Sequence, residues 1–139
     1  MINFFAMVLM ALFIFQVPLT GSFLTLVLGA LVYVTTTTSW GMLISAFAST
    51  QIAAMFGTVI LTVLPATQFS GMMVPVSALS GVAQLMGRGF PMTYFVPISV
   101  GTFTKGLGIE DLWPDLMALV IFIPVLTTLS LLLLRKQER

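Results

Sequence analysis

The sequence contains no cysteine and no histidine, and only 6% of its 139 residues are charged. The two absences exclude disulfides, iron–sulfur clusters, zinc sites built on Cys or His, and histidine acid–base chemistry. A soluble domain has about a quarter of its residues charged, so few polar active sites can be assembled from this chain. With a formal net charge of +1, the chain also lacks a basic surface, and no nucleic acid partner is expected.

Charge is absent from a long first part of the chain. The first 87 residues contain no Asp, Glu, Lys, Arg or His, and the first charged side chain is Arg88. Hydrophobic residues make up 59% of the sequence, so lipid is the expected solvent for most of it. A cleaved signal peptide is disfavoured, because no basic region begins the chain and the residues after Thr20 are again apolar.

Four segments approach the roughly 17–25 apolar residues that a membrane-crossing helix needs. These predicted spans cover residues 2–17, 22–48, 51–74 and 112–134. Residues 75–111 are rich in glycine and proline, and their short apolar runs predict a re-entrant or interfacial segment before the last span. The expected fold is therefore all-α, a polytopic transmembrane helix bundle with about four spans. Short strands within 94–103 are the competing interpretation, disfavoured because an open sheet edge cannot lie in lipid.

Positive charge gathers at the C-terminus, in Arg135, Lys136 and Arg139. Basic residues that flank membrane spans are retained in the cytoplasm, so this tail is expected to be cytoplasmic. Counting back through four spans puts the N-terminus on the same side. The turn at Pro18–Gly21 and the segment 75–111 then face outward, and the loop at Ser49–Gln51 faces inward.

The predicted spans hold no ionisable side chain beyond the acidic cluster at the start of the last one. Proton- and ion-coupled carriers commonly keep such a group inside the bundle as a relay, so a self-powered carrier is disfavoured. The chain also has no glycine-rich phosphate loop of the nucleotide-binding kind. The acidic cluster of Glu110, Asp111 and Asp115 is better explained by a helix N-terminus, with Asp111 as its N-cap, than by a metal site.

Five hydroxyl residues follow one another at 35–39, inside the second span. They could form a polar stripe along a path, or they could bond to carbonyls one turn back and to neighbouring helices. The second interpretation is favoured, because consecutive residues point in all directions around a helix. Small residues four positions apart, Gly41 with Ser45 and Ala53 with Gly57, let helices approach closely. They predict either an interface with another subunit or packing of the second and third spans within the chain, and the pattern does not choose between them.

Pro65 interrupts the third span, because it cannot donate a hydrogen bond to the carbonyl of Leu61. Broken helices mark substrate sites in some transporters. The alternative is a kink at which the span ends and the next segment begins, and the sequence leaves both interpretations open.

The motifs from residue 20 onwards resemble the C-terminal half of ABC transporter type-2 permeases. Residues 41–55 resemble the place in this family where one span ends and a short loop follows. Residues 70–75 resemble the S-G-x-x-x-P motif at which the next span ends. P-M-T-Y-F at 91–95, G-T-F-T-K-G at 101–106 and L-W-P at 112–114 follow in the family's order, before a basic tail. Pro97 and Val100 stand in a stretch where many relatives carry a charged pair.

The resemblance implies a permease component of an ATP-driven exporter in the bacterial inner membrane, forming the translocation path. It implies no enzyme activity and no cofactor in this chain, because a separate ABC ATPase subunit hydrolyses ATP. It implies a second permease copy, identical or different, and it admits a periplasmic adaptor protein as a further partner. It also implies that the chain supplies the last four spans of a longer permease. The alternative is a non-transporting membrane protein, such as an anchor, assembly factor or pore former, or an inert permease fragment.

The resemblance assigns three groups of candidate site residues, none of them catalytic or metal-binding. The lining of the translocation path is expected at Thr58, Thr62 and Gln68. The helix break and outer gate are expected at Pro65, Gly71 and Pro75. The loop facing the ATPase is expected at Ser49, Thr50 and Gln51. An apolar lining would favour drug-like or lipid-like substrates.

Overall fold

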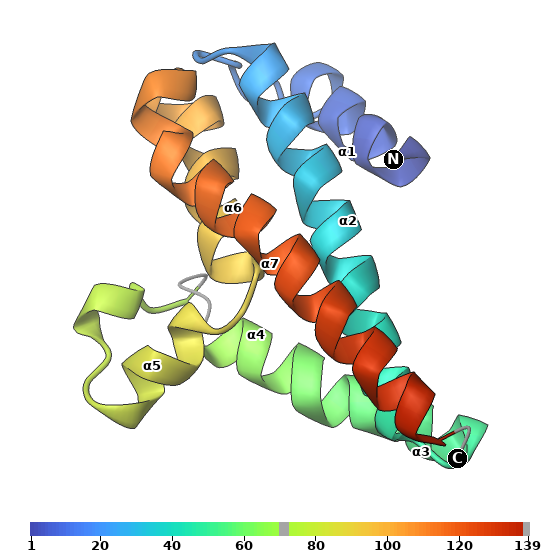
Figure 1. The fold of residues 1–139 in the computed structure, drawn as a ribbon. Coiled ribbons are helices and arrows are strands. Elements are labelled where there is room, and N and C mark those ends of the chain that lie inside the picture. Colours follow the sequence, from blue (N-terminus) through green and yellow to red (C-terminus); the bar gives the residue numbers. More distant parts are fainter. Residues whose placement is uncertain (70–72, 138–139) are drawn as a thin grey trace.

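The computed structural model describes residues 1–69 and 73–137, and the described residues form helices without any strand (Figure 1). The helices in chain order are α1 (Ile2–Phe13), α2 (Phe23–Phe47), α3 (Gln51–Thr58), α4 (Leu64–Phe69), α5 (Val82–Arg88), α6 (Met92–Val100) and α7 (Ile109–Gln137). Two π-helical turns, η1 (Val59–Val63) and η3 (Gly101–Lys105), and one 3₁₀ turn, η2 (Val76–Ala78), complete the order. The all-α prediction is confirmed, and the strand alternative for 94–103 is wrong, because that stretch forms α6 and η3.

Three helices in the described residues are long and apolar enough to cross a membrane. They are Phe23–Phe47 with 25 residues, Gln51–Phe69 with 19 residues and Ile109–Lys136 with 28 residues. The predicted helical membrane bundle is therefore confirmed. Helix α1 has only 12 residues. At 1.5 Å per residue it is about 18 Å long, which is shorter than the roughly 30 Å of bilayer hydrocarbon.

Helix α7 begins at Ile109, three residues before the predicted start of the last span. The preceding turn at Gly106 has a left-handed backbone with φ of 64°, which ends η3 and lets the chain enter α7 directly. Asp111 consequently lies in the first turn of the helix. The prediction that it is the N-cap is therefore wrong. Its carboxylate, with that of Glu110, still lies where the helix dipole favours negative charge.

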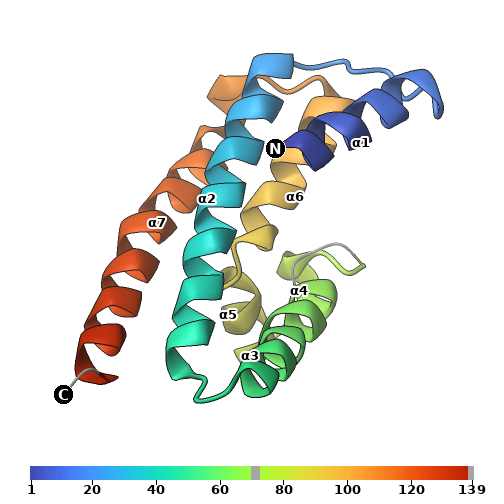
Figure 2. The same ribbon diagram turned by 90° about the vertical axis from the view of Figure 1, so that its right-hand side faces the viewer.

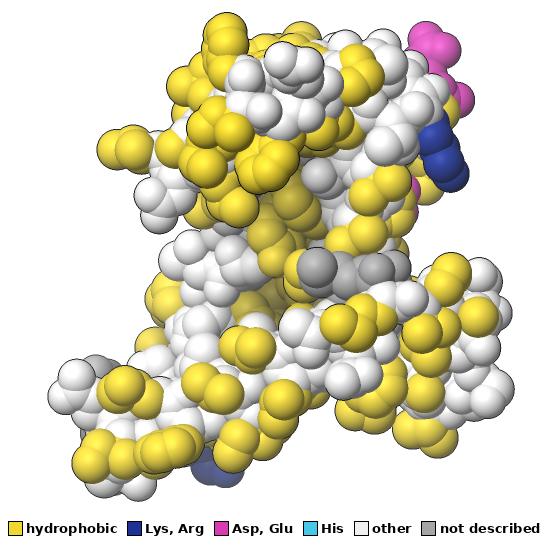
Figure 3. All heavy atoms as spheres, turned by 180° about the vertical axis from the view of Figure 1, so that it is seen from behind, with side chains coloured by type: hydrophobic (Ala, Val, Ile, Leu, Met, Phe, Trp, Pro, Cys, Tyr) yellow, Lys and Arg dark blue, Asp and Glu magenta, His cyan; other side chains and the backbone are white. Residues whose placement is uncertain are grey.

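Helices α2 and α7 run side by side, and α6 packs against both of them (Figures 1 and 2). Their buried core consists of Ile98 from α6 with Leu112, Leu116 and Leu119 from α7. On the α2 side, the ring of Tyr33 stacks on the ring of Phe95 with centroids 4.4 Å apart. By contrast, α3, η1 and α4 diverge from the pair. Only 6% of the 18-residue apolar stretch within Gln51–Phe69 is buried. The face of the molecule seen in Figure 3 is mostly hydrophobic or uncharged, as contact with lipid requires.

The hydroxyl groups at 35–39 form hydrogen bonds within α2 and to α7, as the favoured interpretation predicted. Every one of the five side chains donates to a backbone carbonyl three or four residues earlier, at 2.8–3.1 Å. Thr36 also reaches the carbonyl of Leu119 at 3.2 Å, and Ser39 lies 3.2 Å from the hydroxyl of Thr127. The run therefore satisfies its own polar groups and joins α2 to α7, where unsatisfied groups would be expensive.

The small-residue pairs predicted between the second and third spans do not produce the closest helix contact. A Cβ added at Gly41 would meet nothing within 4 Å, and one added at Gly57 would make an ordinary contact of 3.7 Å with Ile44. The close approach lies elsewhere on α2, at Gly29, where an added Cβ would lie 2.7 Å from Cγ2 of Ile98. Within the chain, α2 packs mainly on α6 and α7, while α3 and α4 diverge from it. The alternative, an interface with another subunit, stays a prediction.

The turn after α1 is fastened to η3 at the end of the bundle where α7 begins. The backbone N–H of Gly21 donates to the carbonyl of Thr102 at 2.9 Å, and the hydroxyl of Thr20 donates to the carbonyl of Phe103 at 3.0 Å. A Cβ at Gly21 would lie 2.8 Å from two carbonyl oxygens, so only glycine fits this backbone contact.

Candidate functional site

A small cavity lies where α2, the helix from α3 to α4, and the start of α6 meet. Its volume is about 90 Å³, and it is lined almost entirely by apolar and aromatic groups. Helix α2 contributes Tyr33, Thr37, Trp40 and Gly41, and the diverging helix contributes Thr58, Thr62 and Ala66. The remaining wall comes from Phe90, Pro91 and Met92. This junction brings together three segments that are far apart in the sequence.

Trp40 of α2 contacts the two other segments that form the cavity wall. Its indole Nε1 donates a hydrogen bond to the hydroxyl of Thr62 at 3.2 Å. Its ring also packs at a tilt of 57° on the ring of Phe90, with centroids 5.6 Å apart. An indole suits this position because a broad apolar ring fills space while its N–H finds a partner. Trp40 thus connects the diverging helix and the start of α6 to the bundle.

The three residues predicted to line a path are placed differently from one another. Thr58 and Thr62 both line the cavity, on the same side of η1. The hydroxyl of Thr58 donates to the carbonyl of Ala54 at 2.8 Å, so this polar group is satisfied within its own helix. Gln68 is exposed and is not part of the cavity lining.

The aromatic residues of the cavity were not predicted from the sequence. Tyr33 and Trp40 lie on either side of the hydroxyl run, and Phe90 lies in a segment expected at the membrane boundary. No local pattern distinguishes them from other aromatic residues of the spans, since their meeting depends on how α2 and α6 pack. The sequence drew attention to Thr37 only as one of the five hydroxyl residues at 35–39, and not as part of a cavity wall.

Pro65 does not end its helix, which continues to Phe69. The turn before it is π-helical, and the N–H of Leu64 donates to the carbonyl of Val59, five residues earlier. This wider turn accommodates the proline ring, which would otherwise clash with a carbonyl four residues earlier. Of the other two residues predicted for the outer gate, Pro75 is exposed and precedes η2, and Gly71 lies outside the described residues.

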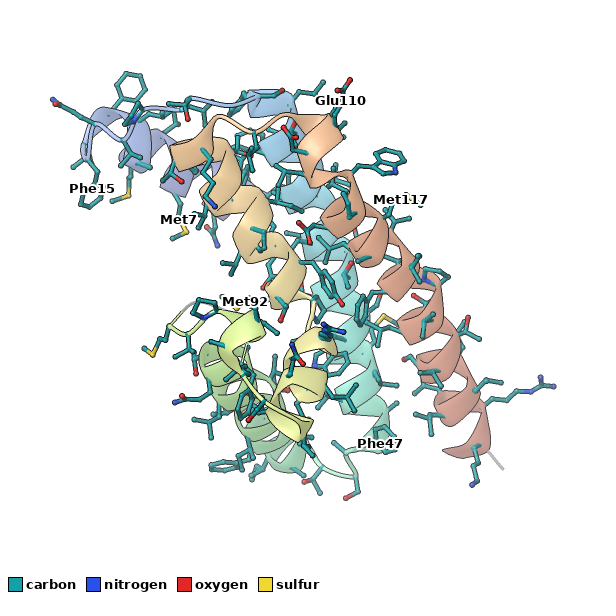
Figure 4. All side chains as sticks on the ribbon, turned by 90° about the vertical axis from the view of Figure 1, so that its left-hand side faces the viewer. Met7, Phe15, Phe47, Met92, Glu110 and Met117 are labelled. Atoms are coloured by element: carbon teal, nitrogen blue, oxygen red, sulfur yellow. The ribbon has the colours of Figure 1, made fainter. Side chains whose placement is uncertain are left out.

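The predicted ATPase-facing loop is exposed and lies at the end of the bundle where α7 finishes. Figure 4 places Phe47, just before this loop, at the opposite end from Glu110. Ser49, Thr50 and Gln51 are all exposed. The hydroxyl of Thr50 accepts a hydrogen bond from the N–H of Ala53 at 3.1 Å, so Thr50 is the N-cap of α3.

The fold and the comparisons together identify the class of the chain. It is a helical membrane protein that combines three long apolar helices with shorter helices among its described residues. A family model described as ABC-2 family transporter protein matches residues 1–132, and the chain therefore belongs to the ABC-2 transporter family. The resemblance seen in the sequence is confirmed by this match.

Two curated relatives show how much of such a protein the chain covers. It is 29% identical over 133 residues to the protein named "Inner membrane transport permease YhhJ" of Escherichia coli (strain K12). A protein of the same name from Shigella flexneri has the same identity over the same length. In both, the match covers 94% of this chain and 35% of the relative, so the chain spans about a third of the relatives' length. No solved structure matches the chain.

Proposed function

We propose that this chain is a membrane-embedded part of a permease that exports a substrate across a bacterial inner membrane, driven by a separate ABC ATPase. The observation that carries the proposal is the family match over residues 1–132. The two relatives are named as inner membrane transport permeases, which supports both the location and the activity. Within this proposal the chain is a non-enzymatic transport component, and the partner hydrolyses ATP.

The helix from α3 to α4 is the proposed wall of the translocation path. It is the least buried of the three long apolar helices. The buried share of its 18-residue apolar stretch is 6%, compared with 28% for α2 and 22% for α7. Thr58 and Thr62 lie on its side facing α2, at the cavity next to a π-helical turn. Such turns occur frequently at functional sites, because they alter helix register without ending the helix. A second permease copy is proposed to complete the path across the exposed side of this helix.

The loop 49–51 and the C-terminal tail are proposed to face the cytoplasm together. The lower end of the bundle carries both the loop after Phe47 and the end of α7 (Figures 1 and 4). The tail contains Arg135 and Lys136, and positive charge favours the cytoplasmic side. The ATPase would therefore meet the permease at this end. Residues 75–111 would form the outer re-entrant segment, and Pro75 at its start would belong to the proposed gate, with Gly71 just before the segment.

Co-purification with the ATPase tests the proposed partnership. The chain, expressed with the rest of its permease and with the cognate ABC ATPase in the same membrane, should retain the ATPase and stimulate ATP hydrolysis. Ser49→Trp should reduce this retention about tenfold, because bulk would be added to the loop that faces the partner. Ser22→Trp is the matched control, since Ser22 is also exposed but lies at the opposite end, just before α2. Permease that retains no ATPase, or equal losses in both variants, would contradict the proposal.

Single cysteines test the orientation, because the chain has no native cysteine to interfere. In right-side-out vesicles, a membrane-impermeant maleimide should label Glu110→Cys and should leave Ser49→Cys unlabelled. Inside-out vesicles should give the reverse pattern. Labelling of Ser49→Cys from the outside would show that the basic tail and the loop do not face the cytoplasm.

A further inference from the structure

A second, larger hollow follows α6 on the side away from the cavity at Trp40. This groove has a volume of about 900 Å³ and lies between η2, α5, α6, η3 and the first turns of α7. Pockets that bind organic molecules have volumes of about 300–1,000 Å³, so the groove is large enough for such a ligand. Val96, Pro97 and Val100 form an apolar wall along α6.

Three of the nine charged residues of the chain line this groove. The sequence has five basic residues, and the only two outside the C-terminal tail, Arg88 and Lys105, both line it. Asp115 lines it too, and it is the only acidic residue that does so. Gln84, Thr93 and Tyr94 add uncharged polar groups to the same lining. In a chain with so little charge, a groove lined by charged side chains of both signs calls for an explanation.

None of these three charged side chains forms an ion pair with another described residue. Arg88 ends α5, Lys105 ends η3, and α6 with η3 between them has 14 residues, or about 20 Å of helix. The two cations therefore lie toward different ends of the groove and not in one compact cluster.

Unpaired charges beside lipid-facing helices are expensive unless water or a ligand reaches them. Two basic groups and one carboxylate leave the groove with a positive balance. A cleft with low-dielectric walls focuses such a field and concentrates ions of opposite sign. The apolar wall of α6 lies between the cations and would take the carbon skeleton of a bound molecule.

We propose that the groove is a water-accessible binding site for organic anions, in which an acidic group meets Arg88 or Lys105 and an apolar body lies along α6. Suitable ligands carry a sulfonate, phosphate or carboxylate on a hydrophobic skeleton. Asp115 weakens the attraction for anions, because its carboxylate lowers the positive balance of the groove. This site does not depend on the proposed export, because its charge preference is a property of the groove alone.

The absence of native cysteine permits a direct measurement of the field in the groove. Val96→Cys places one thiol on the wall of α6, and Ser22→Cys places one outside the groove as a reference. The permease is reconstituted in vesicles of uncharged lipid. Modification rates are measured with the anionic 2-sulfonatoethyl methanethiosulfonate and the cationic 2-(trimethylammonium)ethyl methanethiosulfonate. Relative to Ser22→Cys, the thiol at position 96 should favour the anionic reagent about tenfold.

Charge variants then decide which residues produce the preference. Arg88→Gln with Lys105→Gln should reverse it in favour of the cationic reagent, because only the carboxylate of Asp115 remains. Arg135→Gln with Lys136→Gln is the matched control, since it removes two positive charges outside the groove, and it should leave the preference unchanged. Asp115→Asn should increase the preference for the anionic reagent.

Three results would overturn the proposal. A thiol at position 96 that reacts with neither reagent, while Ser22→Cys reacts with both, would show that water does not enter the groove. A rate ratio equal to that of Ser22→Cys would show that the groove has no anion preference. Equal shifts in the two double variants would show that the preference reflects net charge and not Arg88 and Lys105. Circular dichroism of each variant checks that the helices are intact.

Discussion

Replacing Gly29 with alanine should destabilise the bundle by about 2 kcal/mol, although alanine is the better helix former by roughly 0.5–1 kcal/mol. The reason is the crossing of α2 and α6. The new Cβ would lie 2.7 Å from Cγ2 of Ile98, a side chain that is fully buried and branched at Cβ. Because Ile98 is held on all sides, the helices must separate to admit the methyl group. Equilibrium unfolding in a detergent–SDS titration measures the loss.

Gly41→Ala is the matched control on the same helix. An added Cβ there meets nothing within 4 Å, so this variant should be neutral or slightly stabilising. A further variant, Ile98→Ala, removes the atom with which the new methyl group collides. The double variant Gly29→Ala with Ile98→Ala should then be about 1–2 kcal/mol more stable than the sum of the single losses predicts. Additive losses, or equal losses at Gly29 and Gly41, would show that this crossing is not tightly packed.

Trp40→Ala should cost about 3 kcal/mol and should separate the diverging helix from the bundle. The substitution enlarges the cavity and removes both the hydrogen bond to Thr62 and the ring contact with Phe90. Thr62→Val keeps the size of the side chain and removes only the bond, which is worth about 0.6 kcal/mol on average inside membranes. The same SDS titration measures both variants.

The second tryptophan provides the control for this prediction. Trp113 lies on α7 and is 56% exposed, so Trp113→Ala should change the free energy of unfolding by less than about 1 kcal/mol. If the proposed path follows the helix from α3 to α4, Trp40→Ala should also uncouple transport from ATP hydrolysis, while Trp113→Ala should not. Equal effects of the two substitutions would contradict a special role for the junction at Trp40.

The helices themselves could be predicted because lipid imposes a simple rule. A backbone in hydrocarbon must satisfy its own hydrogen bonds, so long uncharged apolar runs become helices. The span predicted at 22–48 differs from α2, Phe23–Phe47, by one residue at each end. Its limits were marked in the sequence by the turn at Pro18–Gly21 and by the short polar stretch that begins at Ser49. The same rule predicted that the hydroxyl groups at 35–39 would form hydrogen bonds inside the bundle.

Predictions failed where distant segments decide the outcome. Gly41 and Gly29 are both glycines of α2, and only the position of α6 makes one of them a close contact. At Pro65 the sequence predicted an interruption but not its form, which is a π-helical turn after which the helix continues to Phe69. The start of α7 was missed because it depends on the turn at Gly106, which leads the chain directly into the helix.

The sequence by itself determined the solvent, the helical class and the family, because these depend on composition, on the length of apolar runs and on motifs in a fixed order. Only the tertiary structure decided which side chains meet. It brought Trp40 against Thr62 and Phe90, and it placed Arg88 and Lys105 in one groove, from positions 17 apart in the sequence. The physical reason is that lipid selects helices locally, whereas the contacts between helices depend on the shape and packing of their side chains.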